Sequence, residues 1–352
     1  MYFITFTGDT FLKTHPTNSC SPFSESICKL FASSDNVCIN LETTIGTGGI
    51  KAPKAFSFQA PPVSLKFVVD NKVNICNLAN NHSLDYGRDG LQTTINHLNA
   101  QNIKIIGTEE HNCIEISSNG KSFCVCSYYG NQKGLARIDK NTIIADIKTY
   151  KKRVDYVFVC LHWGEEYVAY PKPVQQLLAH ELIDSGASVI IGHHPHVMQG
   201  YEEYNGGLIF YSLGNFNFYV DHPYAKTLVQ TKKAYCVGLN IDVMGTIKYD
   251  IIPININECW QPDIITEEKE KERFMIYLNR ISEPLKGRIK NSFWYAEAAP
   301  HYFKNNMPSW KKRIRQYGFK HFVKMLKWFL NPSIYRYYLG MVQSIFNKKI
   351  IY

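Results

Sequence analysis

Residues 188–196 read SVIIGHHPH, and this stretch decides the fold class. Residues 189–191 are β-branched, which is typical of a buried strand. Gly192 follows them, and three imidazoles then occur within four residues, at His193, His194 and His196. Histidines clustered at such short spacing are typical metal ligands. The stretch therefore predicts a strand whose carboxyl end carries a metal site.

The rest of the first 260 residues alternates between strand-like and helical patterns. Apolar, β-branched and aromatic runs predict strands at 2–7, 37–41, 73–78, 103–106, 113–117, 122–128, 155–161, 188–191 and 207–213, then an all-β stretch over 234–257. Helical patterns cover 24–33, 88–100, 140–152 and 172–185. Strands separated by helices predict an α/β sheet with right-handed crossovers. Turn sequences at Asn119-Gly120 and Met244-Gly245 predict that part of the sheet is antiparallel.

Polar side chains follow most of the other strands where each strand ends. They are Asp9, Glu42, Asn81, His82, Asp85, His162 and Asn215. Ligands of an open α/β sheet bind beyond the carboxyl ends of its strands, so we expect these residues to meet. Carboxylate, imidazole and carboxamide ligands suit Mn²⁺, Fe²⁺, Zn²⁺ or Co²⁺ better than Ca²⁺. Taken singly, each residue also fits a structural role as a cap, a turn residue or a hydrogen-bonded histidine.

Six short motifs of the chain resemble those of the CapA family. They are Gly8-Asp9, Asn40-Leu41-Glu42, Asn81-His82, His162-Trp163-Gly164, the Gly192–His196 cluster and the run Tyr211–Phe216. This family is associated with bacterial poly-γ-glutamate capsule synthesis and belongs to the calcineurin-like metallophosphatase superfamily. The resemblance extends in order from residue 2 to about residue 255. It implies a four-layer α/β/β/α sandwich of the metallophosphoesterase type.

The resemblance also implies a site for two divalent metal ions (Mn, Fe or Zn) at a separation of ~3.5–4 Å. Asp9 and His196 would bind the first ion, and Glu42 would bridge the two. Asn81, His162 and His194 would hold the second ion. His82 would be the acid that meets the leaving oxygen, oriented by Asp85.

The chain departs from the superfamily at three points. The usual first motif is Asp-x-His, but here Thr10 and Phe11 follow Asp9, so one histidine ligand is missing. Glu42 is one methylene longer than the usual bridging Asp. The extra histidine at position 193 leaves the ligand assignment within 193–196 open by one residue. The first metal position is therefore the less well defined of the two.

These features predict a metal-dependent hydrolase linked to the synthesis or remodelling of a capsule or surface polymer. A phosphoester is the first choice for the bond cleaved, and a γ-glutamyl amide is the second, since both reactions need the same charge stabilisation. An anionic polymer or a phosphoester is the expected substrate. The alternative is a non-catalytic, metal-containing binding component of the polymer synthesis machinery. Glu165 and Glu166 would bind an ammonium or a water, or be solvated loop charges.

The charge of the chain is concentrated at its C-terminus. The formal net charge is +9, and the residues after 300 include eleven Lys and Arg but no Asp or Glu. We predict a catalytic domain over 1–260 and a helical, basic and aromatic extension over 261–352. Within 309–352, an apolar stripe flanked by lysines predicts either a helix packed on the catalytic domain or one lying on an anionic membrane. No nucleic acid partner is expected.

The cysteines and the N-terminus predict a cytoplasmic location, with membrane association limited to the surface. Six of the ten cysteines lie in apolar, strand-like runs, so we interpret the cysteines as reduced. These six are Cys38, Cys76, Cys124, Cys126, Cys160 and Cys236. The first residues have no basic segment or cleavage site of a signal peptide. No stretch has the roughly 18 apolar residues that a spanning helix needs.

Overall fold

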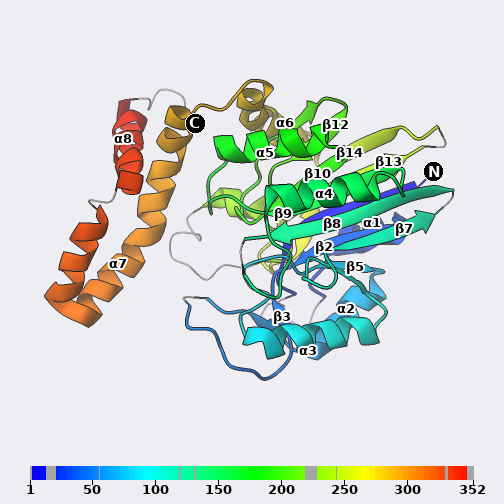
Figure 1. Ribbon diagram of the computed structural model, residues 1–352, viewed down its shortest axis with the longest axis horizontal. Helices are drawn as coiled ribbons and strands as arrows, with labels where there is room; N and C mark the ends of the chain where they lie inside the picture. The colour runs from blue at the N-terminus through cyan, green and yellow to red at the C-terminus, as the bar shows by residue number, and fades with distance from the viewer. Residues whose placement is uncertain are drawn as a thin grey trace.

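The structure is a computed structural model, and it describes residues 2–12, 21–54, 56–118, 120–130, 132–218, 228–242, 244–329 and 332–346 (Figure 1). Two large sheets form its centre. The seven-stranded sheet has the order β15-β14-β13-β1-β2-β5-β6, and the six-stranded sheet has the order β11-β12-β10-β9-β8-β7. The six-stranded sheet has an antiparallel strand at each edge, whereas the seven-stranded sheet has its antiparallel strands on one side only.

In the seven-stranded sheet, four parallel strands come from the first part of the chain. They are β1 (Tyr2–Thr10), β2 (Asn36–Leu41), β5 (Ile75–Asn77) and β6 (Lys104–Ile106). Three antiparallel strands extend the sheet beyond β1, namely β13 (Lys233–Ile241), β14 (Ile247–Ile256) and β15 (Pro262–Ile264). Gly245 has a φ of +89° in the β13–β14 turn, in line with the predicted hairpin.

The six-stranded sheet has four parallel strands, β8 (Lys121–Tyr129), β9 (Tyr156–His162), β10 (Val189–His193) and β12 (Gly207–Phe210). Its antiparallel edges are β7 (Cys113–Ser118) and β11 (Tyr201–Tyr204). The two-residue strands β3 (Thr44–Ile45) and β4 (Gln59–Ala60) pair separately. β3, β4, β11 and β15 were not predicted, because none of them lies in a long apolar or β-branched run.

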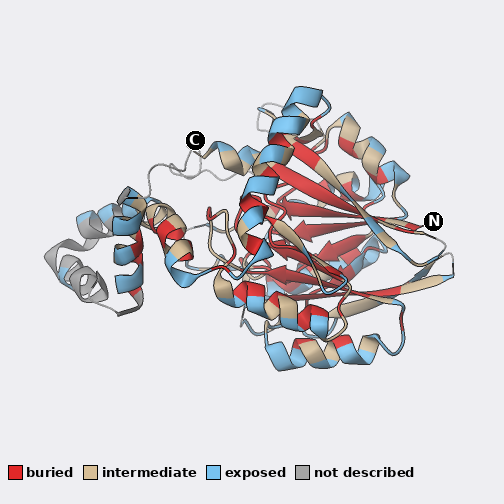
Figure 2. Cartoon of the chain, turned by 90° about the horizontal axis from the view of Figure 1, so that it is seen from above, coloured by how far each residue is buried: buried red, intermediate tan, exposed pale blue. Residues whose placement is uncertain are grey.

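Helices cover the outer face of each sheet, so the predicted four-layer sandwich is confirmed. α1 (Glu25–Ser33), α2 (Leu65–Asp70) and α3 (Gly87–Ala100) share a hydrophobic cluster with the seven-stranded sheet. α4 (Lys140–Tyr150) and α5 (Pro173–Asp184) share another with the six-stranded sheet. A third cluster fills the space between the sheets, where Phe6, Phe123 and Phe158 meet. Figure 2 shows the buried residues gathered along the strands.

The C-terminal part of the chain is helical, as predicted, and contains α6 (Glu268–Ser282), α7 (Asn291–Phe329) and α8 (Pro332–Phe346). Phe274, Leu278 and Ile281 of α6 pack into the cluster between the sheets. α7 continues through Gly318, and much of α7 and α8 stands away from the sandwich (Figure 1). The division of the chain near residue 260 stays a proposal, and hydrophobic packing crosses that boundary.

Most side chains between residues 308 and 333 lie outside the described structure. The apolar stripe that the sequence predicts there, from Trp310 to Leu330, therefore stays a prediction. Among the described residues, no helix is both long enough and apolar enough to cross a bilayer.

The prediction that the cysteines are reduced is wrong for one pair. Cys113 of β7 lies directly opposite Cys126 of β8, their Cα atoms are 4.0 Å apart, and the two form a disulfide. The register of this hairpin brings the two thiols together, and strand-like sequence alone does not reveal a register. Disulfides persist mainly in oxidising compartments, so the cysteines no longer support the predicted cytoplasmic location. Six other cysteines in the described part of the chain are free, namely Cys28, Cys38, Cys76, Cys124, Cys160 and Cys236.

Two glycines allow the backbone that follows β12 to lie directly against the ends of β1 and β10. A Cβ on Gly8 would overlap the carbonyl oxygen of Gly214, and a Cβ on Gly192 would overlap that of Tyr211. Leu213 donates its backbone N–H to the Gly192 carbonyl at 3.1 Å. Each glycine directly precedes a candidate ligand, so this close approach sets the position of Asp9 and His193.

We predict that Gly192→Ala lowers the free energy of unfolding by at least about 2 kcal/mol, because backbone atoms cannot yield as a flexible side chain can. Urea denaturation measures the change. Gly287→Ala is the matched control, since its added Cβ would meet no atom within 4 Å and its φ of −120° suits alanine. Equal stability of the two variants would contradict the close approach.

Candidate metal centre

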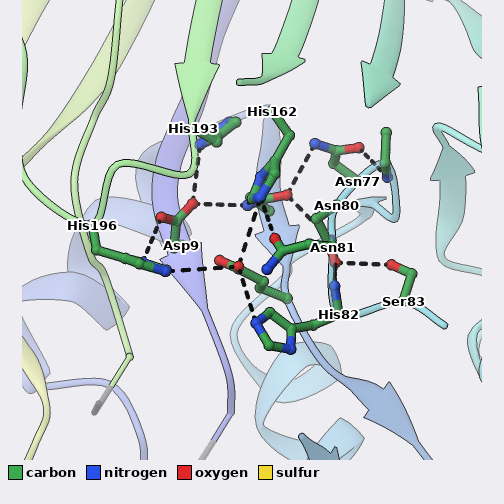
Figure 3. Close-up of polar contacts among 12 residues, drawn as sticks. Asp9, Asn77, Asn80, Asn81, His82, Ser83, His162, His193 and His196 are labelled. Carbon is green, nitrogen blue, oxygen red and sulfur yellow. Dashed lines mark hydrogen bonds and ion pairs between the residues drawn. The ribbon is translucent and has the colours of Figure 1, made fainter. Parts of the chain in front are cut away.

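The predicted ligands meet at one edge of the sandwich, where the parallel strands of both sheets end (Figure 3). Asp9 lies near the end of β1, and Glu42 directly follows β2. His162 is the last residue of β9. Asn81 and His82 lie in the loop between β5 and α3. The seven-stranded sheet thus supplies the carboxylates, and the six-stranded sheet supplies most of the imidazoles.

Two groups of side chains in this cluster have the composition of metal sites. Asp9, Glu42 and His196 form one group, and Glu42, His162 and His194 form the other. Within each group the potential ligand atoms all lie within 4.8 Å of one another. Glu42 belongs to both groups, which is the geometry of a carboxylate that bridges two ions.

Glu42 is fully buried, and neither of its carboxylate oxygens has a hydrogen-bond partner among the described residues. Its Oε1 lies 3.7 Å from His162 Nε2 and 3.9 Å from His196 Nε2. Burial raises the pKa of Glu42 well above its usual range, and the charge of Asp9 adds to the rise. A buried carboxylate without a partner is costly, and divalent metal ions would satisfy it. The residues present therefore fit the implied metal ions.

Asp9 is also fully buried, and its two oxygens have different surroundings. Asn40 Nδ2 donates to Oδ1 at 2.8 Å, and His193 Nδ1 lies 3.6 Å from the same atom. His196 Nδ1 lies 3.1 Å from Oδ2. Although burial disfavours its protonation, Glu42 and Asp9 raise the pKa of His196 to about 10. His193 thus lies beside Asp9 and outside both ligand groups.

The missing histidine of the first motif has an apolar replacement. Phe11 packs against Phe58, with ring centroids 4.6 Å apart, and against Phe218 at 6.1 Å. This position therefore faces an aromatic cluster and provides no ligand atom.

Asn81 completes the second group, because its Oδ1 lies 2.6 Å from His162 Nε2. His194 and His196 have backbone φ angles of +99° and +57°. Residues other than glycine rarely adopt such angles, which cost about 1–3 kcal/mol each and persist mainly at functional sites. The strained loop therefore points to a functional role for these two histidines.

His82 and Asp85 form a buried pair. His82 Nδ1 lies 2.7 Å from Asp85 Oδ2, and His82 Nε2 points toward Glu42, 3.8 Å from its Oε1. Asp85 also forms an ion pair with Lys54, whose Nζ donates to the Asn81 carbonyl oxygen at 2.6 Å. Burial lowers the pKa of His82.

Three further polar residues support the site, and of these only Asn215 was among the strand-end residues expected at this edge of the sheets. Asn40 contacts Asp9, Asn215 Oδ1 lies 3.0 Å from His196 Nδ1, and Lys54 holds Asp85. Asn40 and Asn215 belong to two of the six family motifs, so the sequence indicated that both lie near the site. Lys54 lies in an irregular loop, and no sequence pattern indicated it.

A family model for bacterial capsule synthesis protein PGA_cap matches residues 3–220. The chain belongs to this family. The PGA biosynthesis protein CapA of Bacillus subtilis is 32% identical over 268 residues, which cover 70% of this chain and 68% of that protein. The capsule biosynthesis protein CapA of Bacillus anthracis is 31% identical over 258 residues, which cover 68% of this chain and 61% of that protein.

Solved structures with a similar arrangement include a novel phosphatase from Mycoplasma pneumoniae and a putative 5′-nucleotidase from Staphylococcus aureus. The first is 13% identical with a TM-score of 0.48, and the match covers 79% of this PGA_cap chain and 98% of that chain. The second is 11% identical with a TM-score of 0.46, and the match covers 79% of this chain and 58% of that chain.

We predict that the double variant His162→Ala/His194→Ala loses most of its bound divalent metal while it keeps its circular dichroism spectrum. Two imidazoles of the same ligand group are removed, but the hydrophobic clusters remain. Elemental analysis of the purified protein measures the metal content. His97→Ala, on α3 outside the cluster, is the control. Full metal occupancy in the double variant would refute the ligand assignment.

Proposed function

We propose that this PGA_cap family member is a metal-dependent hydrolase that acts in the synthesis or remodelling of a capsule or surface polymer. One observation carries the proposal. Glu42 is shared by two groups of potential metal ligands, and the Nε2 atom of the His82–Asp85 pair faces it. A histidine in this position is suited to deliver a proton to a leaving group beside two metal ions.

In this proposal, Asp9, Glu42 and His196 hold one divalent ion. Glu42, Asn81, His162 and His194 hold the other. When bound, the ions supply Lewis acidity and activate water, and Mn, Fe or Zn suits the mixed oxygen and nitrogen ligands. Glu42 reaches both positions from one buried side chain.

The protein residues then handle the proton. His82 donates from Nε2 to the oxygen that leaves, while Asp85 Oδ2 accepts a hydrogen bond from His82 Nδ1 and keeps the ring in place. Lys54 neutralises Asp85 and contacts the backbone of Asn81, so it links the acid to the ligand loop. Lys54 is thus a positioning residue in this scheme.

A phosphoester is the first choice for the bond, because the site would stabilise charge on phosphoryl oxygens and protonate an alkoxide. A γ-glutamyl amide is the second choice, since its tetrahedral intermediate carries similar charge. The substrate is then an anionic polymer or a phosphoester, and nucleic acid is not expected. In this proposal the basic residues within 309–352 contact an anionic membrane surface.

The second candidate function is a metal-containing binding component without turnover. Phe11 favours it, because this side chain occupies the place of a histidine ligand and leaves one ion with three protein ligands. p-Nitrophenyl phosphate mono- and diesters, tested with Mn²⁺, Zn²⁺ and Mg²⁺, separate the two functions. Turnover that follows metal content supports the hydrolase. Tight metal binding without turnover of any ester or γ-glutamyl amide supports the alternative.

We predict that His82→Ala retains its metal but loses roughly 10²–10⁴-fold in kcat on an alkyl phosphoester, the usual contribution of a positioned acid. The loss should shrink for p-nitrophenyl esters, whose leaving group needs no proton. Steady-state kinetics on the two esters give the comparison, with metal content as the control. Equal losses on both esters would exclude His82 as the acid.

We predict that the triple variant Lys320→Gln/Lys324→Gln/Lys327→Gln sediments less with phosphatidylserine vesicles at low salt than the parent chain does. Each basic residue near such a surface contributes about 1 kcal/mol. The control is the triple variant Lys148→Gln/Lys151→Gln/Lys152→Gln, which removes the same charge near the end of α4 and leaves the C-terminal region unchanged. If both variants sediment like the parent chain, the C-terminal helix does not bind the membrane.

A further inference from the structure

A cavity of about 240 Å³ lies directly beside the candidate metal centre. Its wall combines the loop after β9, one histidine of the ligand groups, and the helices α7 and α8. The lining residues that matter here are Glu165, Glu166, His194, Tyr302, Asn305 and Tyr337. Since the volume of one liquid water is about 30 Å³, the cavity has room for a substrate group the size of about eight waters.

Hydrophobic packing and hydrogen bonds fix the helical side of this cavity. Trp294 of α7 is buried and donates from Nε1 to the Tyr170 carbonyl oxygen at 3.0 Å. A Cβ on Gly340 would overlap the backbone of Tyr295, so α8 lies tightly against α7. Both helices lie beyond residue 220, where the family match ends. Segments outside the family match thus form part of the cavity wall beside His194.

The charges in the cavity wall are negative. Glu165 is neutralised by Lys172, whose Nζ lies 2.5 Å from its Oε1. Glu166 instead accepts a hydrogen bond from the neutral amide of Asn305 at 3.2 Å, and in the described part of the chain no Lys or Arg forms an ion pair with it. Glu166 therefore offers a cation a carboxylate that no lysine or arginine of the described chain neutralises.

The aromatic residues of the wall favour the same kind of ligand. Tyr302 and Tyr337 stack with ring centroids 4.2 Å apart and an interplanar angle of 23°. Tyr337 is buried and Tyr302 is half-buried. Tyrosine rings attract ammonium groups through their negative faces, and this attraction increases in sites that exclude water. Carboxylate and aromatic groups together are typical of sites for organic ammonium ions.

We propose that this cavity binds an ammonium-bearing part of the substrate, next to the scissile bond. The ammonium lies against Glu166 and the tyrosine pair, and the reacting group lies at His194. The position of the scissile bond rests on the hydrolase function proposed above, but the binding of an ammonium does not. The substrate class is accordingly a phosphoester or amide with an amine close to the bond cleaved, such as the amino end of a polymer chain.

The test uses the full-length, metal-loaded protein and two probes of the same shape. Choline carries a quaternary ammonium, and 3,3-dimethylbutan-1-ol replaces its nitrogen by carbon. We expect NMR titration to show at least tenfold tighter binding of choline. Glu166→Gln should weaken choline binding at least tenfold, and Tyr302→Leu about threefold. Glu272→Gln, an exposed change on α6, is the control for lost charge. Thermal unfolding verifies that each variant is folded.

Hydrolysis of p-nitrophenyl phosphorylcholine and of its 3,3-dimethylbutyl analogue forms a second arm. A preference for the choline ester that Glu166→Gln removes supports the inference and the hydrolase together. Choline binding without hydrolysis of either ester supports the inference and contradicts the proposed function. Equal binding of the two probes, or unchanged choline binding in Glu166→Gln, overturns the inference. A loss of bound metal in Glu166→Gln also overturns the inference, since Glu166 would then be a metal ligand.

Discussion

The buried carboxylate of Glu42 is the constraint on which the rest of the site depends. It lies between imidazoles from the six-stranded sheet and the Asp9 carboxylate of the seven-stranded sheet, without a hydrogen bond to either oxygen. Such a group destabilises the fold unless a cation accompanies it. The ligand loops, the tight glycine contacts and the strained backbone of His194 and His196 all place side chains around this one charge.

The sequence predicted the fold well where elements are long and periodic. The helices 25–33, 87–100, 140–150 and 173–184 end within two residues of their predicted limits. The site could be predicted equally well, because parallel strands bring their carboxyl ends to one edge and each ligand lies at or shortly after the end of a strand. Two features could not be predicted from the sequence. The Cys113–Cys126 disulfide depends on hairpin register, and the helical wall of the cavity depends on how distant segments pack.

The helices α7 and α8 change the interpretation of the basic C-terminal region. From the sequence, this segment was either a helix packed on the catalytic domain or a membrane-binding surface. The part of α7 that precedes residues 309–352 packs through Trp294 and borders the cavity beside His194, whereas the lysines lie farther along α7. If the proposed function and the membrane prediction both hold, one continuous helix would contact the substrate at one end and the membrane surface at the other.

The division of ligands between the two sheets has a consequence for stability. Asp9 and Glu42 follow strands of one sheet, whereas His162, His194 and His196 belong to the other. Divalent ions held between them would act as a cross-link across the interior of the sandwich. At a free metal concentration one hundred times the dissociation constant, one such ion would add about 2.7 kcal/mol to the stability of the native state. The melting temperature of the protein would then report the free metal concentration of its surroundings.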